Sequence, residues 1–230
     1  ENFAEISGQR PDIGRKILSR VARVISRRIR RTTVQIADAG AQYLSGRTRT
    51  EHDLLGDREV PHEYYYGIQT LRALENFPIS GVGLSHFPLL IEALAMVKAA
   101  AVRANRELEL LPAAVADAIA QACQEIMAGK YHQQFVVDMI QGGAGTSTNM
   151  NANEVIANRA LEILGHARGE YQHCHPNNHV NLSQSTNDVY PTALKIALIR
   201  ANGGLTSVLR ELVAALAAKG QQFADVIKMG

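Results

Sequence analysis

The chain has 230 residues, of which 46% are hydrophobic and 5% aromatic, so it can bury a substantial core and does not belong to the disordered class. Two cysteines are too few for a disulfide framework, and charged residues interrupt every long apolar stretch, which argues against a membrane span. Residues 1–50 carry 11 Lys/Arg against 4 Asp/Glu, a net +7, whereas residues 51–230 carry 13 against 18, a net −5. We therefore expect a soluble, helix-rich, cytoplasmic protein that binds neither membrane nor nucleic acid.

The basic front segment has its own pattern. Residues 12–31 place apolar side chains at helical intervals with arginines between them, which predicts a basic amphipathic helix. Such a helix can lie on anionic lipid, contact nucleic acid or belong to a targeting segment, but its ordinary role is to pack on its own protein. Glycine, serine, threonine and charge replace this pattern between Gly40 and Asp57, which predicts a linker. We assign residues 1–50 to an extension and linker and expect the main domain to begin near Glu51.

Helical periodicity dominates the rest of the chain. We expect helices at residues 88–110, 112–129, 153–164 and 205–229. The first two should form an antiparallel pair, because only a short turn with Pro112 separates them. The stretch HPNNHVN, residues 175–181, is too polar and proline-containing for a helix, and a further helical run follows Ser185.

Two polar loops lead directly into helix starts and are the candidate binding elements. The run GGAGTSTN, residues 142–149, combines glycines with hydroxyl and amide groups, and Ser185, Thr186 and Asn187 form a second set. The free N–H groups of a helix start can bind a carboxylate, while the side chains add directional hydrogen bonds without titrating. Each set can equally serve as an ordinary helix cap. Because both loops are poor in Lys and Arg, they favour a small dicarboxylate or amino acid over a polyanion.

The adjacent residues His173, Cys174 and His175 are of types that bind metal ions, which suggests a metal site. Adjacent side chains seldom converge on one ion, however, so we expect no metal and no cofactor.

Several ordered blocks resemble segments of the aspartase/fumarase superfamily, in particular the amino-terminal half of aspartate ammonia-lyases. These blocks are GDREVPHEYYYGIQTLRALENFPISG, QGGAGTSTNMNANEVIANRALEILG, HPNNHVNLSQSTNDVYPTALKIAL and the closing IKMG. The stretch that resembles the family runs from about Glu51 to Gly230, about four fifths of the chain. The segments GGAGTSTNMN and QSTND are closer to ammonia-lyases than to fumarases, which usually show GSGTQSNMN-like and QSSND-like segments.

The resemblance implies an all-α fold with a small helical front domain, residues 51–186, followed by the first helices of a long central bundle, residues 187–230. It also implies the reversible anti elimination of ammonia from L-aspartate to give fumarate, a carbon–nitrogen lyase reaction. Members of the family assemble as homotetramers whose active sites are shared between subunits. The alternatives are a fumarate hydratase and a non-catalytic helical scaffold or interaction protein derived from the superfamily.

The resemblance also implies roles for individual residues. Thr146 is similar to a family threonine that contacts the substrate, and Ser185, Thr186 and Asn187 are similar to the set that holds its carboxylate and amino groups. The family's base is a serine on a glycine-rich loop with a GSS signature, and no GSS occurs in this sequence. We therefore leave the catalytic residue unknown, expect the base to lie beyond Gly230, and expect the 230-residue chain alone to be inactive.

A second anion site is implied by the stretch that begins at His175. His175, Asn177 and Asn178 match a secondary anion site of the fumarases. Because Asn178 stands where an aspartate is commoner, we expect a structural role for these three residues.

Overall fold

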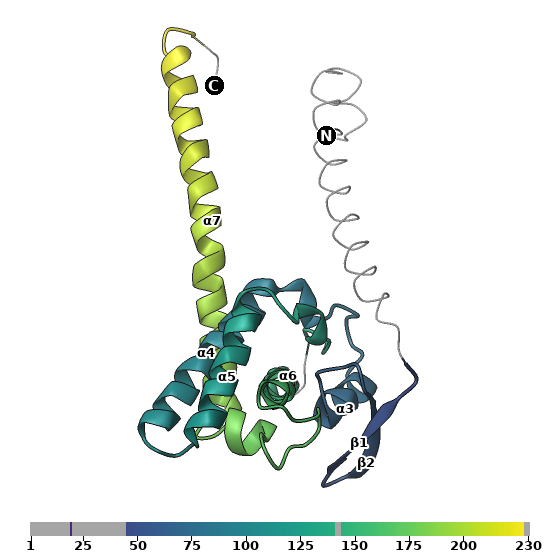
Figure 1. Cartoon of the computed structure of the whole chain (residues 1–230). Helices are drawn as coiled ribbons and strands as arrows, with labels where there is room; N and C mark the ends of the chain where they lie inside the picture. The colour runs from purple at the N-terminus through teal and green to yellow at the C-terminus, as the bar shows by residue number, and fades with distance from the viewer. Residues whose placement is uncertain (1–18, 20–44, 141–143, 228–230) are drawn as a thin grey trace. The chain divides into compact units, whose positions relative to one another are not determined.

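The computed structural model describes Ser19, residues 45–140 and residues 144–227. The basic helix predicted at residues 12–31 therefore lies outside the described residues, apart from Ser19. Internal contacts divide the chain after Ser45, and every element below belongs to the unit Gly46–Gly230. Helices dominate this unit, which confirms the predicted helical class (Figure 1).

An antiparallel hairpin opens the unit. Strand β1 (Thr48–Asp53) pairs with β2 (Gly56–Pro61), with Glu51 opposite Arg58. The hairpin corrects our prediction of a linker up to Asp57. The strand escaped prediction because its fully buried side chain is the charged Glu51, so the usual alternation of apolar and polar residues is missing.

The predicted pair of helices is confirmed. After α3 (Ile68–Asn76) and a short 3-10 turn (Leu84–His86), α4 (Pro88–Glu107) and α5 (Ala113–Met127) pack together. Proline begins α4 at a position where its missing N–H costs nothing. The two helices supply much of the core, with these side chains almost inaccessible: Leu90, Ile91, Leu94, Val102, Ile119 and Ile126.

Helix α6 (Thr146–Ile163) lies at the centre of the unit. It contacts α3, α4, α5 and α7, and Figure 1 shows it end-on with these elements around it. It begins seven residues before the predicted start at residue 153, because its first turns are polar yet buried, as Asn149 and Asn151 show. A helix buried on all sides carries no clear amphipathic pattern from which its start could be predicted.

A π-helical turn (Pro176–Val180) contradicts our prediction that residues 175–181 are non-helical. A separate 3-10 turn (His132–Gln134) lies between α5 and α6 in the sequence. In the π-helical turn, the ring Nδ1 of His175 accepts the N–H groups of Asn177 and Asn178 at 3.0 and 3.3 Å. Proline is tolerated at the first position, so a histidine cap makes this polar stretch helical.

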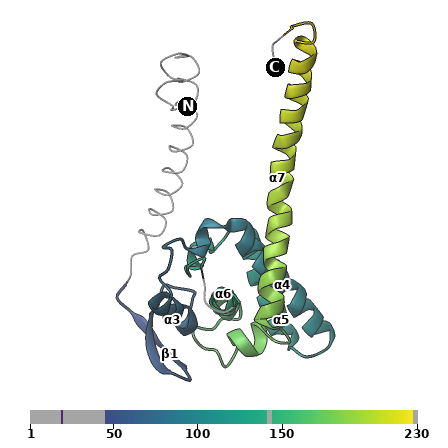
Figure 2. The same ribbon diagram turned by 180° about the vertical axis from the view of Figure 1, so that it is seen from behind.

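Helix α7 (Thr186–Gln222) closes the described chain and joins two runs that we expected to be separate. Its first part packs on α4 and buries Val189, Ala193 and Ala197, and Arg200 Nη2 lies 2.6 Å from Glu92 Oε2. Figures 1 and 2 show the remainder of α7 continuing past the other elements of the unit. None of the helices in the described residues has the length and apolarity that a membrane crossing requires.

Candidate functional site

The structure brings the two predicted loops together at the starts of α6 and α7. The side-chain amide of Asn149, in the first turn of α6, donates to Thr186 Oγ1 at 3.2 Å and to Asn181 Oδ1 at 3.1 Å. Gly145 precedes α6 in a left-handed conformation, with φ of 82°, and an added Cβ would lie 2.4 Å from Cγ of Tyr190 on α7. The two helix starts are therefore in direct contact.

A buried lysine supports the connection that leads into α7. Lys98 of α4 is fully buried, and its Nζ donates to Asn181 Oδ1 at 2.7 Å and to Gln184 Oε1 at 3.0 Å. Burial lowers the pKa of Lys98 to about 7, because the charged ammonium loses its hydration. We did not select this residue from the sequence. Its position one helical turn from both Leu94 and Val102, within an apolar stripe, was the available signal.

The side chain of Ser185 caps the start of α7. Ser185 Oγ accepts the N–H of Asn187 at 3.2 Å, while Ser185 and Asn187 are exposed and Thr186 is half-buried. The capping contact matches the ordinary role that the sequence left open for Ser185. The hydroxyl can still donate its own hydrogen to a ligand. The site roles predicted for Ser185, Thr186 and Asn187 remain predictions.

Thr146 faces a different feature, a cavity of about 660 Å³. Its described lining includes Thr146, His175 and Asn177, but not Asn178 or the three residues at the start of α7. Thr146 thus shares a cavity with two of the three residues assigned to the second anion site. The remaining lining residues are His52, Asp53, Leu54, Leu55, Ile68, Gln69, Met150, Glu154, Tyr171 and Pro176.

The contacts of His175 are local. Its backbone N–H donates to the ring Nδ1 of His179 at 2.7 Å, and its own ring caps the π-helical turn. Burial, followed by the charge of the nearby His179 ring, lowers the pKa of His175, so the neutral ring that can accept these N–H groups is favoured. These contacts support the structural role that we predicted for the segment, and the role itself stays a prediction.

Two buried carboxylates that the sequence did not reveal cap the start of α3. Glu154 of α6 accepts the N–H groups of Gly67 and Gln69, each at 2.8 Å, and Glu51 accepts that of Ile68 at the same distance. Burial raises the pKa of Glu154 to about 7, against the lowering effect of these donors. Glu154 also lines the cavity, so one wall of the cavity holds a buried carboxyl group whose pKa is raised.

The structure places Cys174, between His173 and His175, in the core. Its side chain is fully buried, and burial raises the pKa of the thiol to about 12. Within the described residues, the side chains that gather with metal-ligand spacing are His166, Glu170 and His173.

Comparisons with known proteins agree with these elements. A family model described as lyase matches residues 56–230. A curated Pseudomonas aeruginosa protein named aspartate ammonia-lyase is 61% identical over 183 residues, which cover 80% of this chain and 39% of that protein. The chain therefore spans about two fifths of the length of this curated relative.

Two solved structures share the fold. A Brucella melitensis protein described as fumarate lyase:delta crystallin bound to cobalt is 58% identical, with a TM-score of 0.78 over 80% of this chain and 40% of that one. A class II fumarase from Schistosoma mansoni is 37% identical, with a TM-score of 0.74 over 80% of this chain and 39% of that one.

Proposed function

We propose, from the premise that this chain belongs to the lyase family whose model matches residues 56–230, that the complete protein is an aspartate ammonia-lyase. The reaction is the reversible elimination of ammonia from L-aspartate to give fumarate. The observation that carries the proposal is the 61% identity with the Pseudomonas aeruginosa aspartate ammonia-lyase. The fumarase from Schistosoma mansoni, at 37% identity, is less similar to this chain.

The start of α7 supplies chemistry that suits this reaction. When a base removes the proton next to the β-carboxylate, the electron pair of the broken C–H bond moves onto that carboxylate, and it then expels ammonia from the neighbouring carbon. Negative charge therefore grows on the carboxylate before the amine leaves. A helix start with a partial positive charge, together with the Thr186 hydroxyl and the Asn187 amide, is suited to stabilise that charge.

Each residue has a proposed part. Thr146 at the start of α6 contacts the substrate, and Ser185, Thr186 and Asn187 hold its carboxylate and amino groups. The hydrogen bond from Asn149 to Thr186 supports this assignment, because it fixes the position of the Thr186 hydroxyl relative to α6. The base comes from a segment beyond Gly230, so the 230-residue chain alone should show no steady turnover.

We also propose that the complete protein is a cytoplasmic homotetramer with shared active sites. The second part of α7 exposes a row of large apolar side chains: Leu205, Val208, Leu209, Leu212, Val213 and Leu216. Long apolar faces of this kind are normally covered by other helices in a bundle. Both described free cysteines, Cys123 and Cys174, suit a reducing compartment.

The test is a comparison of products made by the complete protein. Fumarate is incubated with ammonium and, separately, in buffer alone, and the products are separated by chromatography. The proposal predicts L-aspartate in the first reaction and no hydration product in the second. L-malate in both reactions would identify a fumarate hydratase, and no product in either would indicate a non-catalytic scaffold.

A further inference from the structure

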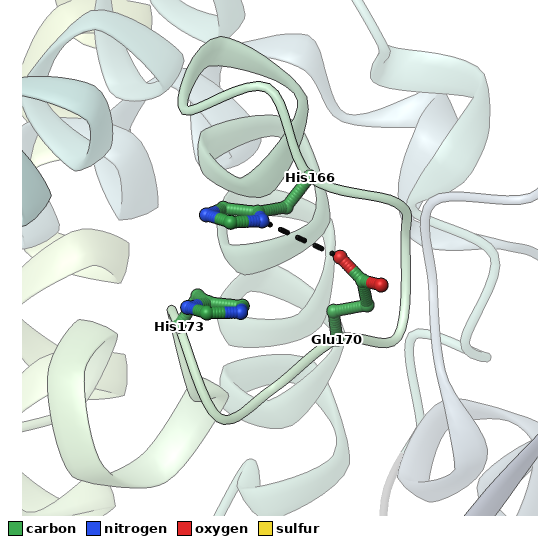
Figure 3. Close-up of side chains that lie close together, drawn as sticks. All are labelled: His166, Glu170 and His173. Atoms are coloured by element: carbon green, nitrogen blue, oxygen red, sulfur yellow. Dashed lines mark ion pairs between the residues drawn. The ribbon is translucent and has the colours of Figure 1, made fainter.

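Three ligand-type side chains gather on the turn that follows α6. His166, Glu170 and His173 each offer one coordinating atom, and these atoms lie within 4.8 Å of one another. The two imidazole rings are stacked, with centroids 3.7 Å apart and planes inclined by 4°. Glu170 Oε2 lies 3.5 Å from His166 Nδ1. Figure 3 shows the rings one above the other, with one nitrogen of each on the side of the Glu170 carboxylate.

We propose that His166, Glu170 and His173 bind a divalent transition-metal ion of the zinc and cobalt class. Two imidazoles and one carboxylate form an open three-ligand set that such ions accept, with water at the fourth position. Magnesium and calcium prefer oxygen ligands throughout, so a set with two nitrogens disfavours them. Bond lengths of about 2.0–2.2 Å place neighbouring ligand atoms of a tetrahedral ion roughly 3.3 Å apart. The group therefore has to contract by about 1.5 Å at its widest, and one of the two stacked rings has to turn, because a bound ion lies in the plane of each imidazole that binds it.

The backbone holds the three residues while their side-chain tips retain freedom to contract. The N–H of His166 donates to Leu161 O at 2.9 Å, and that of His173 donates to Glu170 O at 3.0 Å. His173 is exposed, and the side chains of His166 and Glu170 are 34% and 44% exposed, so a ring can turn out of the stack without disturbing a packed core. The N–H of Ala167 also donates to Glu170 Oε2 at 3.0 Å, and hydrogen bonds of this kind orient metal-bound carboxylates.

An ion at this position would tie the end of α6 to the segment that forms the cavity wall. His166 follows the last residues of α6, whereas His173 lies between the cavity-lining Tyr171 and His175. Metal binding should therefore raise thermal stability, because the ion binds the folded turn and not the unfolded chain. The site goes beyond the proposed lyase reaction and does not depend on it, since its test reads metal binding directly.

The test uses the complete protein, freed of metal with a chelator and titrated with cobalt(II) as a spectroscopic probe. Wild type is compared with His173→Asn and Glu170→Gln, which remove one ligand each. The control is His86→Asn, which alters an exposed histidine outside the group. We expect cobalt(II) to bind tightly, to give visible absorption bands and to raise the melting temperature. Zinc should displace the cobalt(II) and remove these bands. Both ligand variants should lose at least about tenfold in affinity, and the control should bind as wild type does.

The proposal is overturned if wild type shows no such binding, if both ligand variants bind as tightly as wild type, or if the control loses as much affinity as they do. Melting temperatures of the metal-free variants show whether each is folded. Should His173→Asn fail to fold, Glu170→Gln decides, because its amide oxygen can still accept the Ala167 N–H.

Discussion

The starts of α6 and α7 have similar polar sequences but are built in different ways. The start of α6 has no side-chain cap, and the buried, left-handed Gly145 precedes it and fits against Tyr190. The start of α7 has a side-chain cap from Ser185 and is largely exposed. One start is thus defined by close packing of the backbone, the other by a local hydrogen bond that leaves its neighbouring side chains outside the core.

This difference bears on which side chains are available to bind a ligand. At α6, the glycine is needed because a side chain would collide with α7. At α7, Ser185 satisfies the backbone, so Thr186 and Asn187 are not needed as caps and can serve a substrate. The hydrogen bond from Asn149 to Thr186 then links the packed start to the exposed one.

The largest effect on stability should come from Gly145→Ala. A left-handed alanine costs roughly 1–2 kcal/mol, and the collision with Tyr190 adds about 1–3 kcal/mol of overpacking. The matched control is Gly165→Ala, which has the same φ of 82° but no atom within 4 Å of the added Cβ. In urea unfolding, Gly165→Ala should lose only the roughly 1–2 kcal/mol of unfolding free energy that a left-handed alanine costs. Equal losses would mean that the contact with Tyr190 is not close-packed.

A smaller effect concerns the buried Lys98 beneath the connection to α7. Its folded pKa of about 7 lies below the ordinary 10.5, so the unfolded chain binds more protons between these values. Stability should therefore rise as pH increases above 7, by about 1–2 kcal/mol up to pH 8.5. Lys98→Met should lack this rise when the free energy of unfolding is measured across that range. An identical slope in wild type and variant would show that Lys98 is not the titrating group.

The smallest effect should come from Ser185→Ala, which removes the cap of α7. We expect a loss of about 1 kcal/mol in the free energy of unfolding, because the N–H of Asn187 loses its acceptor. Ser185→Thr keeps a hydroxyl oxygen in the same place and should retain most of the stability. If the threonine variant is as unstable as the alanine variant, the capping bond does not account for the loss.

The sequence predicted the elements that depend on local signals. Pro88 begins α4, Gly165 ends α6, and the apolar residues of α4 and α5 repeat at helical intervals, so these helices could be located. The same holds for the two polar loops, whose residues the structure brings into contact. The helix expected from residue 205 is instead the second part of α7, which continues through Gly203 and Gly204 although each glycine costs a helix about 1 kcal/mol.

The elements that escaped prediction depend on partners distant in sequence. Glu51 is buried in an ion pair with Arg49 of the same strand, at 2.8 Å, and it also accepts the N–H of Ile68 and the hydroxyl of Tyr171, which lies 120 positions away. Lys98 can be buried because the side-chain oxygens of Asn181 and Gln184 accept hydrogen bonds from its ammonium group. No local pattern marks a charged residue as buried when its partners lie on other elements.

The measurement that tests the account most directly combines kcat/KM for L-aspartate with the melting temperature of Asn187→Ala in the complete protein. If the amide binds substrate at the start of α7, kcat/KM should fall roughly thirtyfold to a thousandfold, equivalent to about 2–4 kcal/mol, while the melting temperature changes little. If Asn187 only helps to form the helix, the variant should instead lose about 1 kcal/mol of stability and keep normal kinetics. An unstable but kinetically normal variant would contradict the assignment of the α7 start as the substrate site.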